Sequence, residues 1–293
     1  MNTLTFPFRL GLIGYPLGHS LSPRIHNAAL RAAGLLGEYA LYPVSPQSEE
    51  AEISIQRLLG LLRMGEIHGL NITIPYKQTI IPLLDDLTPT ARAVGAVNTI
   101  FRCAERIIGD NTDAPGFWAD VQQLWDREPP PPRRALILGA GGSARAVAYA
   151  LLTHGYEIVV AARRLEQANA LRQSLAAVSD GVQTIDLSPS SIDRFTRLSH
   201  LIVNATPVGM YPDVDDSPWP LMVPFPQKAV LYDLVYNPAE TSLVARARSA
   251  GLTAVTGTGM LVEQAALAFE RWTGHQAPRR AMRAAATSEQ VNQ

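Results

Sequence analysis

The sequence predicts an α/β protein made of two α/β domains, the second of them built on a doubly wound parallel sheet. Short apolar runs alternate with helical stretches along both halves of the chain, a pattern typical of mostly parallel sheets. The proline run 129–132 cannot continue a helix and favours a stiff, extended connector. Beyond this run, a strand passes through a glycine-rich turn directly into a helix. We therefore expect two units that join near residue 113.

The first half opens with a strand at residues 8–14, which is apolar and lies between two prolines. Ser22 followed by Pro23 predicts a helix that runs to about Ala33, with the serine as its cap and the proline in its first turn. The other elements expected here are a strand at 38–44, a helix through about residue 63, a strand at 68–74, and a hairpin of strands 96–102 and 106–109.

The second half alternates more regularly, after a helix expected at residues 115–126. The strands expected beyond the proline run are 135–138, 157–161, 200–204, 229–234 and 253–256, and the helices are 143–153, 165–178 and 260–273. From about Arg279 the chain is polar, and we expect a frayed tail there.

Composition narrows the classes of function. The 293-residue chain has a formal net charge of −1, whereas nucleic-acid-binding proteins usually have a strong basic excess. Its single cysteine, Cys103, cannot form an intramolecular disulfide. Residues 1–16 lack the basic stretch of a signal peptide, and no apolar run approaches the ~20 residues that span a bilayer. The histidines lack metal-ligand spacing. We expect a cytoplasmic protein that binds no nucleic acid, membrane or metal.

A candidate cofactor site follows the strand at 135–138. Its turn reads Gly139-Ala140-Gly141-Gly142-Ser143-Ala144 and fits the pattern G-x-G-x-x-G/A of dinucleotide-binding units. Glycines let the backbone approach a diphosphate, which binds unpaired N–H groups at the helix N-terminus. The next strand ends in Ala162-Arg163-Arg164 instead of the acidic residue that bonds the ribose of NAD. Because guanidinium groups pair with a 2′-phosphate, the sequence predicts NADP(H).

Candidate substrate-binding and catalytic side chains occur in the first half, and each also has a purely structural interpretation. Ser20 and Ser22 could both donate to a carboxylate, or Ser22 could simply cap the helix. Lys77 follows a strand, where a lysine is usually a solvated surface residue. Asp113 ends a Gly-Asp-Asn-Thr-Asp segment whose carboxylates could form a turn. Asn98 lies on an apolar strand and needs a buried partner or a ligand.

Taken together, these segments resemble the shikimate dehydrogenase family. The motifs that carry the resemblance are, in order, GYPLGHSLSP, NITIPYK, GAVNT, GDNTD, GAGGSARA, NATPVGM, DLVYNP and GTGMLVEQA, and they span roughly residues 11–272. The resemblance implies an active-site cleft between two domains. It assigns residues 1–113 to a substrate-binding and catalytic domain, completed by a C-terminal helix at 258–293. It assigns residues 114–257 to a Rossmann-type domain that binds NADP.

The resemblance also implies roles for single residues. Ser20 and Ser22 match the motif that binds the substrate carboxylate, and Lys77 and Asp113 match the catalytic pair. The positions that bond ring hydroxyls match Thr73, Asn98, Asp113, Tyr236 and Gln264. Gly139 to Ser143 match the diphosphate loop, and Leu234 and Gly257 match positions near the nicotinamide. Family members commonly have Asn-Arg-Thr where this chain has Ala162-Arg163-Arg164, so the central arginine is kept while its polar neighbours differ.

The activity that the resemblance implies is reversible NADPH-dependent reduction of 3-dehydroshikimate to shikimate, a step in aromatic amino-acid biosynthesis. A charged lysine would give a proton to the emerging alkoxide, and a carboxylate would hold its ammonium in place. Two alternatives stay open: a quinate/shikimate dehydrogenase of broader specificity, and a non-catalytic NADP-responsive binding protein on the same scaffold. Both a monomer and a homodimer are compatible with the sequence.

Overall fold

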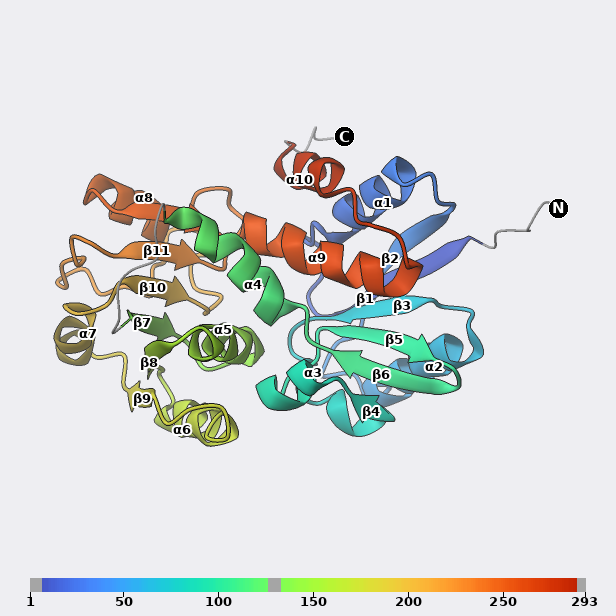
Figure 1. Ribbon diagram of the computed structural model, residues 1–293, viewed down its shortest axis with the longest axis horizontal. Helices are drawn as coiled ribbons and strands as arrows, with labels where there is room; N and C mark the ends of the chain where they lie inside the picture. The colour runs from blue at the N-terminus through green and yellow to red at the C-terminus, as the bar shows by residue number, and fades with distance from the viewer. Residues whose placement is uncertain (1–6, 126–132, 289–293) are drawn as a thin grey trace. The chain divides into compact units, whose positions relative to one another are not determined.

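The computed structural model describes residues 7–125 and 133–288, which divide into two compact units. The first unit comprises the described residues up to Thr112 and from Val262 onward, and the second comprises Asp113 to Leu261 (Figure 1). Each unit contains one six-stranded sheet, so the prediction of two α/β domains is confirmed. The proline run at 129–132 that we expect to act as a connector lies outside the described residues.

The sheet of the first unit has the strand order β2-β1-β3-β5-β6-β4. Its strands are β1 (Phe8–Gly14), β2 (Gly37–Pro43), β3 (Gly69–Ile72), β4 (Asp86–Leu87), β5 (Thr99–Cys103) and β6 (Arg106–Asp110). β1 pairs in parallel with β2 and β3, whereas β5 is antiparallel to both β3 and β6. The predicted hairpin is therefore present as β5 and β6. β4, which is only two residues long, was not predicted because it has no periodicity to detect.

The helices of this unit are α1 (Ser22–Ala32), α2 (Ala51–Met64), α3 (Pro89–Val94), α10 (Arg279–Thr287) and most of α9 (Thr258–Thr273), with a 3₁₀ turn at Ile81–Leu83. The predicted cap is wrong, because Ser22 is already helical and the cap position is held by Leu21. The predicted frayed tail is also wrong. α10 buries Met282 and Ala286, which are four residues apart on one face, and it lies beside α1 (Figure 1).

The sheet of the second unit is entirely parallel and has the order β12-β11-β10-β7-β8-β9. Its strands are β7 (Arg133–Leu138), β8 (Tyr156–Ala161), β9 (Val182–Ile185), β10 (Leu201–Asn204), β11 (Val230–Asp233) and β12 (Thr253–Thr256). The chain moves outward from β7 to β9 and then returns to β10 on the other side of β7. The sheet is therefore doubly wound, as predicted, with its switch point between β7 and β10, where such sheets bind ligands.

The helices of the second unit are α4 (Asp113–Val121), α5 (Gly142–Thr153), α6 (Leu165–Ser174), α7 (Pro189–Thr196) and α8 (Ser242–Ser249), with a 3₁₀ turn at Gln122–Leu124. α7 and α8 were not predicted, although each starts at a capping side chain. Ser188 accepts from the Ser191 N–H, and Thr241 accepts from the Val244 N–H. Among the described residues, no helix combines the length and apolarity that crossing a membrane requires.

Candidate functional site

Thr73 and Gly14 lie against each other where β3 and β1 end. The Thr73 N–H donates to the Ile13 oxygen at 2.9 Å, and a Cβ added to Gly14 would lie 2.3 Å from Thr73 Cγ2. The loop after Gly14 carries Ser20, which is half-buried, and leads into Ser22, the buried first residue of α1. The Ser22 N–H donates to Ser20 Oγ at 3.3 Å, so the two serines are held together. They lie at the carboxyl end of parallel strands, where α/β proteins bind ligands.

Lys77 lies in the turn after β3 and is half-buried, so it differs from an ordinary solvated lysine. Its main-chain oxygen accepts from the Val97 N–H at 2.7 Å, which ties the turn to the residue before Asn98. The Ile72 N–H, at the end of β3, donates to the main-chain oxygen of Asn98 at 2.9 Å. The backbone therefore places Lys77 and Asn98 on adjoining segments.

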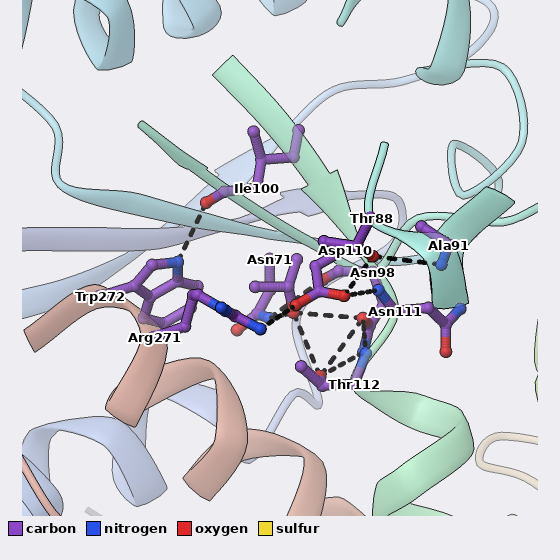
Figure 2. A network of polar contacts seen from close by, with 11 residues as sticks. Asn71, Thr88, Ala91, Asn98, Ile100, Asp110, Asn111, Thr112, Arg271 and Trp272 are labelled. Atoms are coloured by element: carbon purple, nitrogen blue, oxygen red, sulfur yellow. Dashed lines mark hydrogen bonds and ion pairs between the residues drawn. The ribbon is translucent and has the colours of Figure 1, made fainter. Parts of the chain in front are cut away.

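Asn98 is buried at the centre of a polar network (Figure 2). Its Oδ1 accepts from the Thr112 N–H at 2.7 Å and from the Thr99 hydroxyl at 3.1 Å. Its Nδ2 donates to Thr112 Oγ1 at 2.9 Å and to Gln264 Oε1 at 3.3 Å. Because a backbone N–H can only donate, the amide oxygen must face Thr112. Asn98 therefore turns its nitrogen, a donor, toward buried Gln264 on α9.

Asn71 supports this network and was missed by sequence reasoning. Its Oδ1 accepts from the Tyr39 hydroxyl at 2.8 Å. Its Nδ2 donates to the main-chain oxygen of Asn98 at 3.0 Å and to Thr99 Oγ1 at 3.1 Å. All of its amide donors and one acceptor are thus used inside the protein. The signal that could have found it is the spacing of Asn71 and Thr73, because residues two apart share one face of a strand.

Asp113 is buried and is the first residue of α4, directly after Thr112. The N-terminal end of a helix dipole stabilises a carboxylate there. The other carboxylate of this segment, Asp110, lies at the end of β6, and its Oδ1 accepts from the Asn111 N–H at 2.8 Å. Asp113 falls in the second unit and Lys77 in the first, so the pairing of these two residues stays a prediction.

The turn between β7 and α5 has the shape that a diphosphate site requires. Gly139 has a φ of 106°, and a Cβ there would lie 3.0 Å from Thr206 Cγ2. Gly141 occupies the cap position of α5, and a Cβ there would meet nothing within 4 Å. Packing within the protein therefore does not require glycine at position 141. An open approach to the N-terminus of α5, where the helix dipole favours negative charge, fits an anionic ligand.

Two arginines follow the end of β8. Ala162 is buried, whereas Arg163 and Arg164 are exposed and immediately precede α6. In the described part of the chain, neither guanidinium has an ion-pair partner. Positive charge that is not neutralised by the protein fits a phosphate ligand at the position where NAD-binding units carry an acid.

The ends of β11 and β12 bring Leu234 and Gly257 together. A Cβ at Gly257 would lie 2.4 Å from the Leu234 oxygen, so a larger residue would separate the two segments. Tyr236 follows on the same loop, and burial raises the pKa of its hydroxyl. The hydroxyl therefore stays protonated at neutral pH and can donate to a carboxylate.

In the described ranges, no group of three or more His, Cys, Asp or Glu side chains is placed to hold a metal.

A buried carboxylate that sequence reasoning missed anchors the loop with Leu234 and Tyr236. Asp233 Oδ1 accepts from Asn204 Nδ2 at 2.8 Å and from the Val235 N–H at 3.1 Å, and its Oδ2 accepts from the Thr241 hydroxyl at 2.7 Å. Burial raises the pKa of Asp233 to about 6, against these hydrogen bonds. Asn204 and Asp233 open two of the motifs that carry the family resemblance, NATPVGM and DLVYNP. Their position in these motifs was the available signal.

Three protein families match parts of the chain. The family described as "Shikimate dehydrogenase substrate binding domain" matches residues 12–100, and "Shikimate 5'-dehydrogenase C-terminal domain" matches residues 257–287. Residues 134–218 match "NADP oxidoreductase coenzyme F420-dependent", which covers the turn after β7 and the two arginines after β8.

Similar proteins extend over almost the whole chain. The shikimate dehydrogenase (NADP(+)) of Salinibacter ruber is 44% identical over 276 residues, which are 92% of this chain and 94% of that protein. Shikimate 5-dehydrogenase of Thermus thermophilus, solved with NADP(H) and shikimate, matches with a TM-score of 0.80 and 37% identity over 95% of this chain and 98% of that one. Quinate dehydrogenase of Corynebacterium glutamicum, solved with NAD, matches with a TM-score of 0.84 and 33% identity, again over 95% and 98%.

Proposed function

Because the chain belongs to the shikimate dehydrogenase family, we propose that it catalyses the reversible NADPH-dependent reduction of 3-dehydroshikimate to shikimate. The observation that carries the proposal is the buried amide cluster of Asn98 and Gln264. The two amides bond each other at 3.3 Å, which is longer than an ordinary N–H···O bond, so a polar ligand would replace that bond at little cost. A ring that carries several hydroxyls is such a ligand. The reaction is a step in aromatic amino-acid biosynthesis.

The substrate carboxylate and the ring hydroxyls would be bound by two different sets of side chains. The hydroxyls of Ser20 and Ser22, with that of Tyr236, would donate to the carboxylate. Asn98 would donate through Nδ2, exchanging its long bond to Gln264 Oε1 for one to the substrate, since its Oδ1 is held by the Thr112 N–H. Further ring hydroxyls would bond Thr73, Asp113 and Gln264. Each neutral hydrogen bond contributes about 0.5–1.5 kcal/mol, so the affinity would be spread over many contacts.

NADPH would be held by Gly139 to Ser143 at its diphosphate and by Arg163 and Arg164 at its 2′-phosphate, with Leu234 and Gly257 beside the nicotinamide. Bound there, it would supply the hydride for the ketone carbon. Lys77 Nζ would give a proton to the carbonyl oxygen as that oxygen gains charge, and the Asp113 carboxylate would hold the ammonium in position. In the oxidation direction, Lys77 would take the proton back from the hydroxyl.

A second candidate, a quinate/shikimate dehydrogenase of broader specificity, is favoured by the match to the Corynebacterium glutamicum quinate dehydrogenase. Quinate has an additional hydroxyl on the carbon that bears the carboxylate, which would crowd Ser20 and Ser22. We expect kcat/KM with NADP⁺ to be at least ~10-fold higher for shikimate than for quinate. Comparable values would favour the broader enzyme. A chain that binds NADPH but does not oxidise it with 3-dehydroshikimate would be the non-catalytic binding protein instead.

We also propose that the enzyme works in the cytoplasm, as a monomer or a homodimer, with its small-molecule ligands as its partners. The family's biosynthetic role supports this location. Size-exclusion chromatography with light scattering distinguishes the two oligomeric states.

A further inference from the structure

A second set of polar contacts fastens α9 to the sheet of the first unit. Arg271 Nη2 donates to Asp110 Oδ2 at 3.0 Å, where the Asp110 side chain is 7% exposed and the Arg271 side chain is 48% exposed. The guanidinium carbon lies 5.0 Å from the centroid of the Phe101 ring. Beside it, Trp272 Nε1 donates to the Ile100 oxygen at 3.0 Å (Figure 2). These contacts join α9 to both β5 and β6.

Asp110 also supports Asn98 directly. The Asp110 main-chain oxygen accepts from the Asn98 N–H at 3.1 Å. The second carboxylate oxygen, Oδ1, accepts from the Thr88 hydroxyl at 2.6 Å and from the Asn111 N–H at 2.8 Å (Figure 2). Those donors are neutral, whereas Arg271 brings a positive charge to the buried carboxylate. Removal of the Arg271 guanidinium would leave the negative charge of buried Asp110 without a compensating cation. This loss destabilises more than the loss of an exposed ion pair.

We propose that Arg271 and Asp110 form a positioning pair for the substrate site, setting the register of α9 so that Gln264 Oε1 faces Asn98 Nδ2. Gln264 and Arg271 are seven residues apart, which is about two helical turns, so both side chains lie on one face of α9. This face meets Asn98 at one end and Asp110 at the other. The proposal rests on the proposed function, because it makes the orientation of two substrate-binding amides depend on residues that do not touch the substrate.

The test compares Arg271→Ala and Arg271→Lys with a matched control, Arg63→Ala. Arg63 forms an ion pair with Asp85 in the same unit at 2.6 Å, with side chains 45% and 30% exposed. Arg271→Ala should raise KM for shikimate ~3–10-fold, while kcat and KM for NADP⁺ stay within ~2-fold. Arg271→Lys should restore KM to within ~2-fold of the wild type, and Arg63→Ala should leave it unchanged. An unchanged KM in Arg271→Ala would overturn the proposal.

A double-mutant cycle with Gln264→Ala separates positioning from general destabilisation. If Arg271 acts through Gln264, then Arg271→Ala should raise KM by less than ~2-fold in the Gln264→Ala background. If the factors by which the two substitutions raise KM multiply fully in the double variant, the proposal is overturned and the proposed function stays intact. A wild-type chain that does not oxidise shikimate would instead overturn the proposed function.

Amide hydrogen exchange tests the proposed positioning pair independently of activity, because the measurement needs no turnover. The Asn98 N–H, which bonds the Asp110 oxygen, should exchange faster in Arg271→Ala than in Arg63→Ala. Equal exchange in the two variants would refute the pair whatever the activity of the enzyme.

Discussion

The buried imidazole of His26 should make the stability of the protein depend on pH. His26 is fully buried, stacks on Tyr39 with ring centroids 4.3 Å apart and planes at 1°, and lies 5.4 Å from the Trp272 ring. Neither ring nitrogen has a hydrogen-bond partner of ordinary geometry among the described residues. Burial lowers the pKa of His26 from 6.5 to about 3, with the neighbouring Asn71 side chain opposing the shift.

The sign follows from where the proton binds. Because the folded pKa lies below the unfolded value of 6.5, the unfolded chain takes up the proton first as pH falls. Above pH 6.5 the ring is neutral in both states and makes no pH-dependent contribution, and stability is lost as the pH falls from there toward 3. At about pH 5, which is ~1.5 units below the unfolded pKa, the free energy of unfolding is lower by ~2 kcal/mol.

We propose His26→Phe as the perturbation, because phenylalanine keeps the stacked ring and cannot titrate. Urea unfolding, followed by tryptophan fluorescence, gives the stability of the wild type and the variant at several pH values. Between about pH 7.5 and 5, the wild type should lose ~2 kcal/mol relative to the variant. The control Ile25→Val, a fully buried neighbour on α1, should destabilise by ~0.5–1.5 kcal/mol at every pH. A pH-independent difference between wild type and His26→Phe would refute this account of the histidine.

Three further outcomes are expected. Lys77→Ala should lower kcat by ~10²–10⁴ with a much smaller change in KM, and combining it with Asp113→Asn should be non-additive; a near-normal kcat with a raised KM would reassign Lys77 to binding. In Arg163→Ala, the KM for NADP⁺ should rise ~10-fold or more, whereas the KM for NAD⁺ should stay nearly unchanged. Equal increases in the two KM values would contradict a 2′-phosphate contact. For Asp233, the folded pKa of about 6 exceeds the unfolded 3.8, so stability should fall by up to ~3 kcal/mol as pH rises from about 4 to 6. Asp233→Asn should flatten that slope in urea unfolding, and parallel profiles for variant and wild type would count against it.

The sequence by itself determined the features that depend on neighbouring residues. Apolar runs placed β1, β7 and β12 correctly or within two residues, because a buried parallel strand is a continuous apolar segment. The turn at Gly139 was predictable because a strand, a glycine-rich segment and a helix start follow one another directly. The resemblance of the ordered motifs to one family was equally readable, and the relatives confirm it.

Only the tertiary structure decided which distant side chains meet. Asn98 bonds Gln264 across 166 residues, and Arg271 bonds Asp110 across 161, and neither partner carries a local signal of the other. The same holds for α10, whose sequence predicted a frayed tail, although Met282 and Ala286 are buried in the first unit. Helix and strand propensities act over a few residues, whereas the cost of burying a polar group is set by whatever the fold packs against it. The orientation of the Asn98 amide is therefore a property of the assembled sheet and α9, not of the GAVNT motif that contains it.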